Sequence, residues 1–358
     1  MKNILVVDDS ALMRRVICDI IESDERFHVQ DKATNGLEAL DLICSKSYDA
    51  VILDVNMPRM NGLELLQELQ KRKVSANIMM VSTDTMEGAK TTLDALELGA
   101  MDFVHKPGNA MDCRTEDFKD RLLGVLTAVS DSKMKMNVFQ KLPTSKIPAA
   151  PRKTIDIPRR SIPMVSGSKI VAIASSTGGP KALQSVVPKL PGNLKVPVVI
   201  VQHMPAAFTA SLAERLDTLS ELHVKEAAEG DVLEAGNVYI AKGGKHLNIV
   251  MSSGKYSIHY TDEPNREGVK PCANYMYESL RDSKFDEIVC VVMTGMGADG
   301  TKGIINLKEK KKLHVIAQES STCAVYGMPR SVVNAGLADQ IVPLEQIAQE
   351  ITMNVGVR

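Results

Sequence analysis

Short apolar runs alternate with amphipathic stretches along the first 130 residues. The runs have the length of strands and are Ile4–Val7, Val29–Ala33, Ala50–Leu53, Ile78–Val81 and Met101–Val104. Between them, Leu37–Cys44, Leu63–Leu69 and Thr91–Leu98 carry apolar residues three and four positions apart, which is typical of helices with one buried face. This alternation predicts a five-stranded parallel sheet with five helices on its two faces.

A second pattern of the same kind begins after Lys169. Dense β-branched runs, typical of buried parallel strands, are Ile170–Ala174, Val196–Val201 and Ile288–Met293. The helical patterns that follow them are Lys181–Val187, Thr209–Leu216 and Thr301–Glu309. Short strands with glycine between them, which we expect to form an antiparallel insertion, are Val238–Ala241, Leu247–Met251 and Tyr256–Tyr260. The sequence therefore predicts a second, doubly wound and mainly parallel α/β sheet.

The stretch between the two patterns lacks periodicity and differs in charge from both. Residues 133–169 carry 9 basic and 1 acidic side chains, with 5 of the 16 prolines of the chain. Residues 1–132 carry 15 basic and 23 acidic groups, and residues 170–358 carry 19 and 20. We therefore expect two domains, 1–130 and 169–358, joined by a basic, proline-containing linker over 131–168. The linker is either a solvated tether or a contact for the acidic first domain.

Composition excludes several classes of protein. No run approaches the roughly 18 apolar residues that a membrane span needs, and the apolar run near the N-terminus is too short for a signal peptide. The expected location is the cytoplasm. Cysteines without metal-ligand spacing, which we expect to be buried thiols in a reducing compartment, are Cys18, Cys44, Cys113, Cys272, Cys290 and Cys323.

Polar residues at the strand ends of the first domain predict a phosphoryl site. Ligands in open parallel sheets bind outside the carboxyl ends of the strands. The residues expected at that edge are Asp8, Asp9, Asp54, Ser82 and Lys106. Three converging carboxylates repel one another unless a cation binds, and oxygen ligands suit Mg²⁺. A lysine and a hydroxyl on the same rim can stabilise a transferred phosphoryl group.

The first domain resembles the receiver domain of two-component response regulators. The motifs that carry the resemblance are Asp8-Asp9, Leu53-Asp54-x-x-Met57-Pro58-x-Met60-x-Gly62, Ser82 and Phe103-x-x-Lys106-Pro107. The resemblance implies that Asp54 accepts a phosphoryl group from a sensor histidine kinase. It also implies that Mg²⁺ is held by Asp8, Asp9, Asp54 and the carbonyl of Asn56. Ser82 and Phe103 would form a switch pair, and Lys106 would contact the phosphate.

The second domain carries a possible serine nucleophile. Ser176 lies at a predicted strand-to-helix turn, where Gly178 and Gly179 let the backbone approach closely and Pro180 suits the first helical turn. His203 ends the next strand and could act as general base, and Asp299 could orient its imidazole. The order Ser…His…Asp differs from the Ser…Asp…His of the α/β-hydrolases, and no G-x-S-x-G elbow is present.

A dinucleotide site is the other interpretation of the same loops. Gly295-x-Gly297-x-x-Gly300 follows a strand and opens a helical pattern, and Glu319 stands 19 residues beyond Gly300. This spacing matches the dinucleotide-binding fingerprint. However, the interpretation leaves Ser176 and His203 without a role and puts the charge of Asp299 inside the phosphate loop.

The second domain also resembles the chemotaxis protein-glutamate methylesterase family. The motifs concerned are Ala174-Ser175-Ser176-Thr177-Gly178-Gly179-Pro180, Gln202-His203-Met204-Pro205-x-x-Phe208-Thr209-x-Ser211, Ala241-x-Gly243-Gly244-x-His246, Thr294-Gly295-Met296-Gly297-x-Asp299-Gly300 and Tyr326-Gly327-Met328-Pro329. The resemblance implies hydrolysis of glutamyl methyl esters, and deamidation of specific glutamines, on methyl-accepting chemoreceptors. The implied site has nucleophile Ser176, base His203, orienter Asp299 and backbone oxyanion donors at Thr177 and Met296, with no cofactor.

The resemblance also implies regulation and a place in the cell. An unphosphorylated receiver would cover the esterase site, and recruitment to membrane chemoreceptor clusters is expected. The family pattern is broken at Lys242, where proline is usual, and over Lys270-Pro271-Cys272-Ala273-Asn274, where R-P-S-V-D is usual. The triad residues are not among these changes, which concern receptor contacts or local packing. Nucleic-acid binding is not expected, because the second domain is nearly neutral. A catalytically inactive receptor adaptor remains an open alternative.

Overall fold

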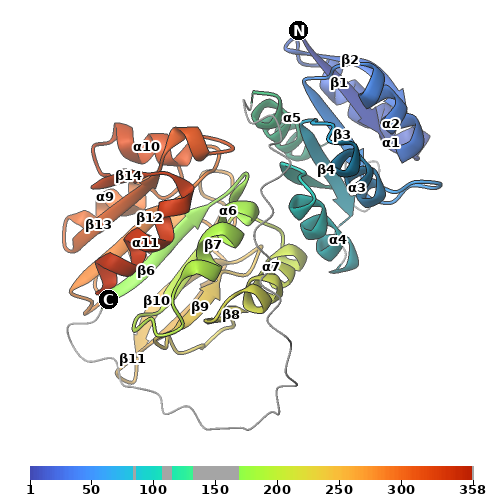
Figure 1. Cartoon of the computed structure of the whole chain (residues 1–358). Helices are drawn as coiled ribbons and strands as arrows, with labels where there is room; N and C mark the ends of the chain where they lie inside the picture. Colours follow the sequence, from blue (N-terminus) through green and yellow to red (C-terminus); the bar gives the residue numbers. More distant parts are fainter. Residues whose placement is uncertain (84–85, 107–114, 132–168, 357–358) are drawn as a thin grey trace, which may run out of the picture.

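The structure, a computed structural model, describes residues 1–83, 86–106, 115–131 and 169–356. These residues form two parallel sheets covered by helices on both faces, and one antiparallel pair of strands (Figure 1). The fold class expected from the sequence is therefore confirmed. The predicted linker lies outside the described residues from position 132 to position 168. No described helix is both long and apolar enough to cross a membrane.

The first sheet has the strand order β2-β1-β3-β4-β5, and all of its neighbouring pairs are parallel. Its strands are β1 (Lys2–Val7), β2 (Phe27–Ala33), β3 (Ala50–Asp54), β4 (Ile78–Thr83) and β5 (Asp102–Lys106). The chain passes from β1 outward to β2 and returns to β3 on the other side of β1. The loops after β1 and β3 therefore diverge, and a crevice opens at their carboxyl ends.

Five helices cover the first sheet. Apolar residues of α1 and α5 pack on one face, and those of α2, α3 and α4 pack on the other. The helices are α1 (Ala11–Glu22), α2 (Gly36–Ser45), α3 (Gly62–Arg72), α4 (Met86–Glu97) and α5 (Glu116–Asp131). A Cβ atom at Gly62 would lie 2.4 Å from the carbonyl oxygen of Asp54, so only glycine fits there. A capping box between Asn61 and Glu64 starts α3 and fixes the loop that follows Asp54.

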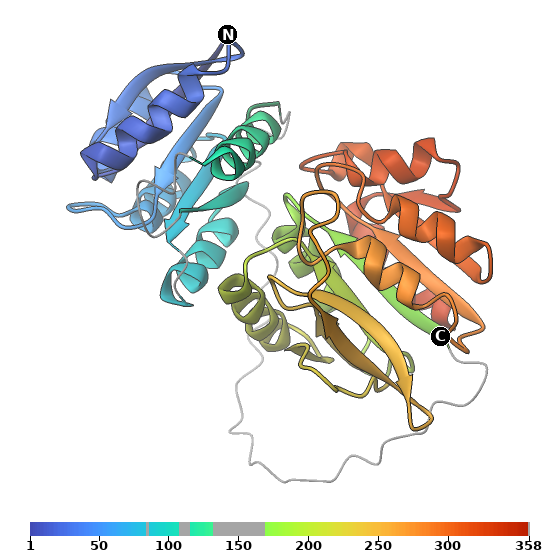
Figure 2. The same cartoon turned by 180° about the vertical axis from the view of Figure 1, so that it is seen from behind.

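The second sheet has seven strands in the order β14-β13-β12-β6-β7-β9-β8, again with parallel pairs. They are β6 (Lys169–Ser175), β7 (Val198–Gln202), β8 (His223–Glu226), β9 (Asn237–Ile240), β12 (Glu287–Val292), β13 (Lys312–Gln318) and β14 (Gln340–Val342). The separate hairpin consists of β10 (His246–Ser252) and β11 (Lys255–Thr261). Seen from behind in Figure 2, this hairpin crosses one face of the sheet.

Helices cover both faces of the second sheet as well. Apolar residues of α6, α7 and α11 pack on one face, while α8, α9, α10 and the hairpin pack on the other. The helices are α6 (Gly179–Val186), α7 (Ala206–Leu219), α8 (Ala273–Ser279), α9 (Thr301–Lys308), α10 (Met328–Asn334) and α11 (Leu344–Val355). The short 3-10 turns are η2 (Val187–Lys189) and η3 (Ser320–Thr322).

The structure corrects two expectations. The segment expected as the first strand of the antiparallel insertion is β9, which pairs in parallel with β7 and β8 in the main sheet. The segment is short and flanked by glycines like the hairpin strands, but β9 lies between β7 and β8 and three of its four residues are buried. Cys44, expected to be buried, is exposed on α2, and Cys113 lies outside the described residues. The other four cysteines are buried and free.

The two sheets meet through helices. Helix α4 of the first unit lies against α7 of the second in both views (Figures 1 and 2). Apolar residues such as Leu93 and Leu96 of α4 join Leu212 and Leu216 of α7 in one continuous buried cluster. The contact between α4 and α7 therefore combines an apolar cluster with an ion pair between Arg215 of α7 and Glu97 of α4.

Candidate active site

Three carboxylates gather at the carboxyl edge of the first sheet, as the sequence predicts. Oxygen atoms of Asp8, Asp9 and Asp54 all lie within 4.8 Å of one another. Asp8 and Asp54 are buried, whereas Asp9 is exposed to solvent. An all-oxygen donor set that is open to water on one side fits Mg²⁺. Asn56, whose carbonyl is the fourth expected ligand, lies in the exposed loop after β3.

A buried lysine neutralises part of this negative charge. The Nζ atom of Lys106 lies 2.7 Å from Asp8 Oδ2 and 2.8 Å from Asp54 Oδ2. Burial alone would lower the pKa of Lys106, but the two carboxylates outweigh it and raise the pKa above its usual value. Ser82, which is also buried, donates its hydroxyl proton to the Gly88 carbonyl at 3.3 Å. The structure thus brings together these expected site residues at the end of β1, β3, β4 and β5.

Ser176 lies on a tight turn between β6 and α6. Its N–H donates to the carbonyl of Thr294 at 3.0 Å, and its own carbonyl accepts from Gln202 Nε2 at 2.9 Å. Gly178 continues the turn with φ 73°, a left-handed conformation that favours glycine. A Cβ atom at Gly295 would lie 2.8 Å from Ser176 Cβ, so the loop after β12 runs directly beside this serine.

His203 and Asp299 form the hydrogen-bonded pair that the sequence predicts. The distance between His203 Nε2 and Asp299 Oδ2 is 2.8 Å, and only 9% and 2% of the two side chains are exposed. Because a carboxylate only accepts, Nε2 carries the proton and Nδ1 remains with a lone pair for a second partner. The N–H of His203 donates to the carbonyl of Ser175 at 3.1 Å, which ties the end of β7 to the residue before Ser176.

Two backbone N–H groups near the serine have no acceptor in the part of the chain that the structure describes. They belong to Thr177, which is buried, and to Met296, whose side chain is 47% exposed. These are the two positions expected to donate to an oxyanion. Unpaired N–H groups beside a hydroxyl are suited to bind the oxygen of an attacked carbonyl.

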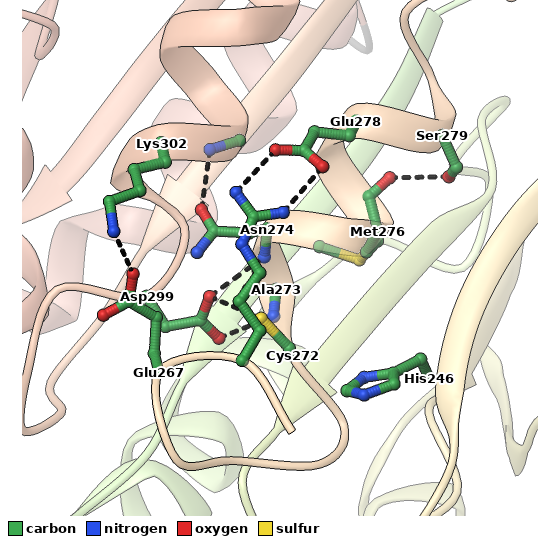
Figure 3. A network of polar contacts seen from close by, with 12 residues as sticks. His246, Glu267, Cys272, Ala273, Asn274, Met276, Glu278, Ser279, Asp299 and Lys302 are labelled. Carbon is green, nitrogen blue, oxygen red and sulfur yellow. Dashed lines mark hydrogen bonds and ion pairs between the residues drawn. The ribbon is translucent and has the colours of Figure 1, made fainter. Parts of the chain in front are cut away.

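Asp299 is held by five donors, several of which are drawn in Figure 3. Its Oδ2 accepts from His203 and, at 2.6 Å, from the Ala273 N–H. Its Oδ1 accepts from Cys272 Sγ at 3.0 Å, the Asn274 N–H at 3.0 Å and the Gly300 N–H at 2.8 Å. Burial alone would raise the pKa of Asp299, but these bonds outweigh it and hold the pKa below its usual value.

The residues that sequence analysis missed lie in the segment that departs from the family pattern. The triad residues themselves are unchanged, but Cys272, Ala273 and Asn274 of this segment all donate to Asp299, so the departure lies in the packing around the triad. The side-chain oxygen of Asn274 also accepts from the N–H groups of Gly300 and Gly303. The departure from the family pattern was the signal in the sequence that this segment has a special role. Its position beside Asp299 depends on the tertiary structure and could not be predicted from the sequence.

The same loop does not serve the dinucleotide interpretation. Asp299 stands between Gly297 and Gly300 of the fingerprint, and its carboxylate is fully engaged with His203 and α8. A buried negative charge at this point would repel a pyrophosphate. Lys242, the other departure, pairs with Glu226 at 3.9 Å in an exposed position.

Residues of the first domain contact the second domain near the turn that carries Ser176. The carboxyl group of Asp102, at the start of β5, lies beside Thr177 and Gly178, and burial raises its pKa to about 7 against the lowering effect of their polar groups. The Phe103 ring stacks on Phe208 of α7, with centroids 4.5 Å apart and planes at 16°. A Cβ atom at Gly124 of α5 would lie 2.8 Å from the methyl group of Met296.

The fold and the two sites define a class of protein in which a receiver unit is joined to an α/β catalytic unit. Comparison with known proteins gives the same division. The family model described as CheB methylesterase matches residues 171–351, and the response regulator receiver domain model matches residues 4–116. The chain belongs to the CheB methylesterase family and is a hydrolase that carries a receiver domain.

Individual relatives match over the whole chain. The protein-glutamate methylesterase/protein-glutamine glutaminase of Geobacillus kaustophilus is 42% identical over 355 residues, which cover 99% of this chain and 98% of the relative. The protein of the same name in Bacillus subtilis is 40% identical over 354 residues, 98% of each chain. The crystal structure of the Thermotoga maritima CheB methylesterase catalytic domain is 42% identical, with a TM-score of 0.51, and covers 53% of this chain and 100% of that one.

Proposed function

We propose that this protein hydrolyses methyl esters of glutamate side chains on methyl-accepting chemoreceptors and deamidates specific receptor glutamines, for adaptation in chemotaxis. The observation that carries the proposal is the His203–Asp299 pair, 2.8 Å apart, beside the turn of Ser176. The printed names of the relatives describe the same two activities. A Ser–His–Asp arrangement supplies what both reactions need, because each begins with attack on a carbonyl carbon.

In the proposed mechanism the Ser176 hydroxyl oxygen attacks the ester carbonyl while His203 Nδ1 takes its proton. The N–H groups of Thr177 and Met296 bind the oxyanion of the tetrahedral intermediate. Collapse of the intermediate breaks the bond to the methoxy group, which leaves as methanol with the proton from His203. A water molecule, deprotonated by His203, then hydrolyses the glutamyl ester of Ser176. An amide substrate follows the same course and releases ammonia.

Asp299 has a supporting role in this mechanism. Its carboxylate accepts the Nε2 proton of His203 and so leaves Nδ1 free to accept the proton of Ser176. It also stabilises the positive imidazolium that forms in each transition state. The ring nitrogens are used in the opposite sense to the familiar serine proteases, where Nδ1 faces the aspartate.

The test is release of methanol from a methylated receptor by the full-length protein and by its Ser176→Ala variant. We expect the variant to lose at least about 10³-fold in rate, since the nucleophile is gone. Phosphorylation of Asp54 in the same variant serves as the control for folding. Retained methanol release by the variant would rule out Ser176 as nucleophile, and no release by the wild type would favour a catalytically inactive adaptor.

We also propose that the receiver switches this activity. Asp54 would accept a phosphoryl group from a sensor histidine kinase. Asp8, Asp9, Asp54 and the Asn56 carbonyl would hold Mg²⁺, which when bound neutralises carboxylate and phosphoryl charge. Lys106, whose Nζ lies 2.8 Å from Asp54 Oδ2, and the buried Ser82 would contact the phosphoryl group.

The contacts between the two units support control by covering. Asp102 lies beside Thr177 and Gly178, directly after the proposed nucleophile. Phe103, the expected partner of Ser82 in the switch, stacks on Phe208 of the catalytic unit. A phosphate-induced change at Ser82 and Phe103 would therefore act at the contact itself. We propose that the receiver domain covers residues 1–130, the linker 131–168 and the catalytic domain 169–358. We also propose that the protein is recruited to membrane chemoreceptor clusters.

A further inference from the structure

The carboxylate of Asp299 has one partner, besides His203, that a side-chain substitution can alter. Three of its five donors are backbone N–H groups, from Ala273, Asn274 and Gly300, and these depend little on side-chain identity. The fifth donor is the thiol of Cys272, 3.0 Å from Oδ1 (Figure 3). The strength of this one bond therefore influences how much negative charge Asp299 offers to His203.

The thiol is fixed in position and in protonation state. Cys272 is completely buried and forms the residue before α8. Burial, together with the charge and hydrogen bond of Asp299, raises the pKa of Cys272 to about 12. The sulfur therefore keeps its proton over the working pH range and acts only as a donor. The thiol is a weaker donor than the hydroxyl of a serine in the same place.

We propose that Cys272 is a positioning residue for the hydrolytic reaction. Its thiol holds Asp299 Oδ1 so that Oδ2 faces His203 Nε2, and its weak donation leaves the carboxylate more basic than a serine would. This inference rests on the proposed esterase function of Ser176 and His203. It assigns a role to one of the changes by which this chain departs from the family pattern.

Three ionisable groups lie around the Cys272 segment. Burial lowers the pKa of His246, which packs against Tyr275 of α8. Burial raises the pKa of Tyr277, on α8, well above its usual value, so its hydroxyl stays neutral. The ion pair with Glu278 raises the pKa of Arg266, so the guanidinium stays charged. These neighbours are the same in the wild type and in every Cys272 variant, so a change in the acid limb of the activity profile after substitution of Cys272 is assigned to the Asp299–His203 pair.

Two substitutions should act in opposite directions on that pair. In Cys272→Ser, a stronger donor withdraws charge from Asp299, which stabilises the imidazolium less. In Cys272→Ala, the donor is lost, so the carboxylate becomes more basic and less firmly oriented. We expect the acid limb of kcat/KM to move by about half a pH unit to lower pH in the serine variant, and by a similar amount to higher pH in the alanine variant.

The rates should separate positioning from packing. We expect kcat of Cys272→Ala to fall about tenfold with KM nearly unchanged, because orientation of Asp299 matters in the transition state. Cys272→Ser should restore most of kcat. Cys290→Ala, which removes another fully buried thiol in β12, is the matched control and should leave the pH profile in place. Methanol release would be measured on the full-length protein with Mg²⁺ and a small phosphoryl donor.

A second measurement does not depend on activity. The ring N–H proton of His203 can be followed by NMR in the Ser176→Ala background, where its chemical shift reports the hydrogen bond to Asp299. We expect the resonance to move in opposite directions in the serine and alanine variants of Cys272. Unchanged resonances and pH profiles, or equal losses of activity in both variants, would overturn the proposal. A wild type without methanol release but with these NMR shifts would instead contradict only the esterase function.

Discussion

Two buried aspartates, one in each sheet, show how surroundings give one residue type two different functions. Asp54, 8% exposed, has Lys106 on Oδ2 and the Val55 N–H on Oδ1, and it lies beside two further carboxylates. Asp299, 2% exposed, accepts five hydrogen bonds. Among the described residues, the one cluster of potential metal ligands consists of Asp8, Asp9 and Asp54 and does not include Asp299.

The number of donors explains the difference. A carboxylate with few donors keeps lone pairs free for a phosphoryl group and a cation. A carboxylate with every lone pair engaged is a poor nucleophile, but it is a rigid acceptor for one imidazole. We therefore expect substitutions of the two residues to have separable effects, one on chemistry and the other on control.

The largest effect is expected for Asp299→Asn. The NH₂ group of an amide cannot accept hydrogen bonds from His203 or from the residues before and in α8. The imidazole of His203 is then no longer held in the tautomer that has its proton on Nε2. The rate of methanol release should fall about 10⁴-fold. Transfer of a phosphoryl group to Asp54 should be unchanged in this variant, and a rate within tenfold of wild type would contradict the assigned role.

Substitution of the other aspartate should remove control and spare chemistry. In Asp54→Asn, stimulation of methanol release by a phosphoryl donor with Mg²⁺ should disappear, so that the rates with and without donor become equal. The exposed residue Asp41, on α2, gives a control variant, Asp41→Asn, that should still respond. Stimulation that persists in Asp54→Asn would place the acceptor elsewhere.

A smaller effect is expected at the contact between the units. Phe103→Ala removes the ring stacked on Phe208, a pair worth about 0.5–1.5 kcal/mol beyond the buried area. The covered state is weakened, so the rate without phosphoryl donor should rise up to about tenfold toward that of a fragment covering 169–358. Leu37→Ala, on the exposed side of α2, is the control. An unchanged rate in Phe103→Ala would argue against covering.

The smallest predicted effect concerns pH. In the covered state burial raises the pKa of Asp102 to about 7, and separation exposes the carboxyl group, whose ordinary pKa is about 4. The covered state therefore binds more protons between these pH values, so raising the pH from about 4 to about 7 weakens covering, and a further rise has no effect.

This pH effect is measured as a ratio. The rate of the unphosphorylated full chain, divided by that of the 169–358 fragment, should increase over the stated range and level off above about pH 7. Asp102→Asn cannot titrate and should give a flat, lower ratio, because its neutral amide carries no charge to desolvate when the covered state buries it. A sloping ratio in that variant would assign the pH dependence to another group.

Periodicity and motif spacing predicted most of the architecture. The continuous apolar runs form the central strands. In each sheet the residues at the carboxyl ends of these strands meet as expected, Asp54 with Asp8 in the first sheet and His203 with Asp299 in the second, because parallel strands end at one edge. Short edge elements were harder, since β8, with four residues, carries too few positions for a pattern. Whether β9 belongs to the main sheet or to the hairpin depends on which strands it pairs with, and the sequence pattern along the chain does not determine this pairing.

The supports of the site could not be predicted. Cys272 reaches Asp299 across 27 positions in the sequence, and Asp102 meets Gly178 across the boundary between the two units. Both contacts arise from packing of α8 and of the receiver, which no local pattern describes. Sequence thus gave the reacting groups but not the residues that hold them in place.

The apolar character of the contact between α4 and α7 has a consequence for temperature. Leu93 and Leu96 of α4 share one buried cluster with Leu212 and Leu216 of α7. Separation of the units would expose the apolar surface that α4 and α7 share to water and raise the heat capacity. Attraction between apolar surfaces weakens on cooling. Cold should therefore loosen the resting enzyme without any phosphoryl transfer, and a cell that changes temperature would experience a drift in the unstimulated rate.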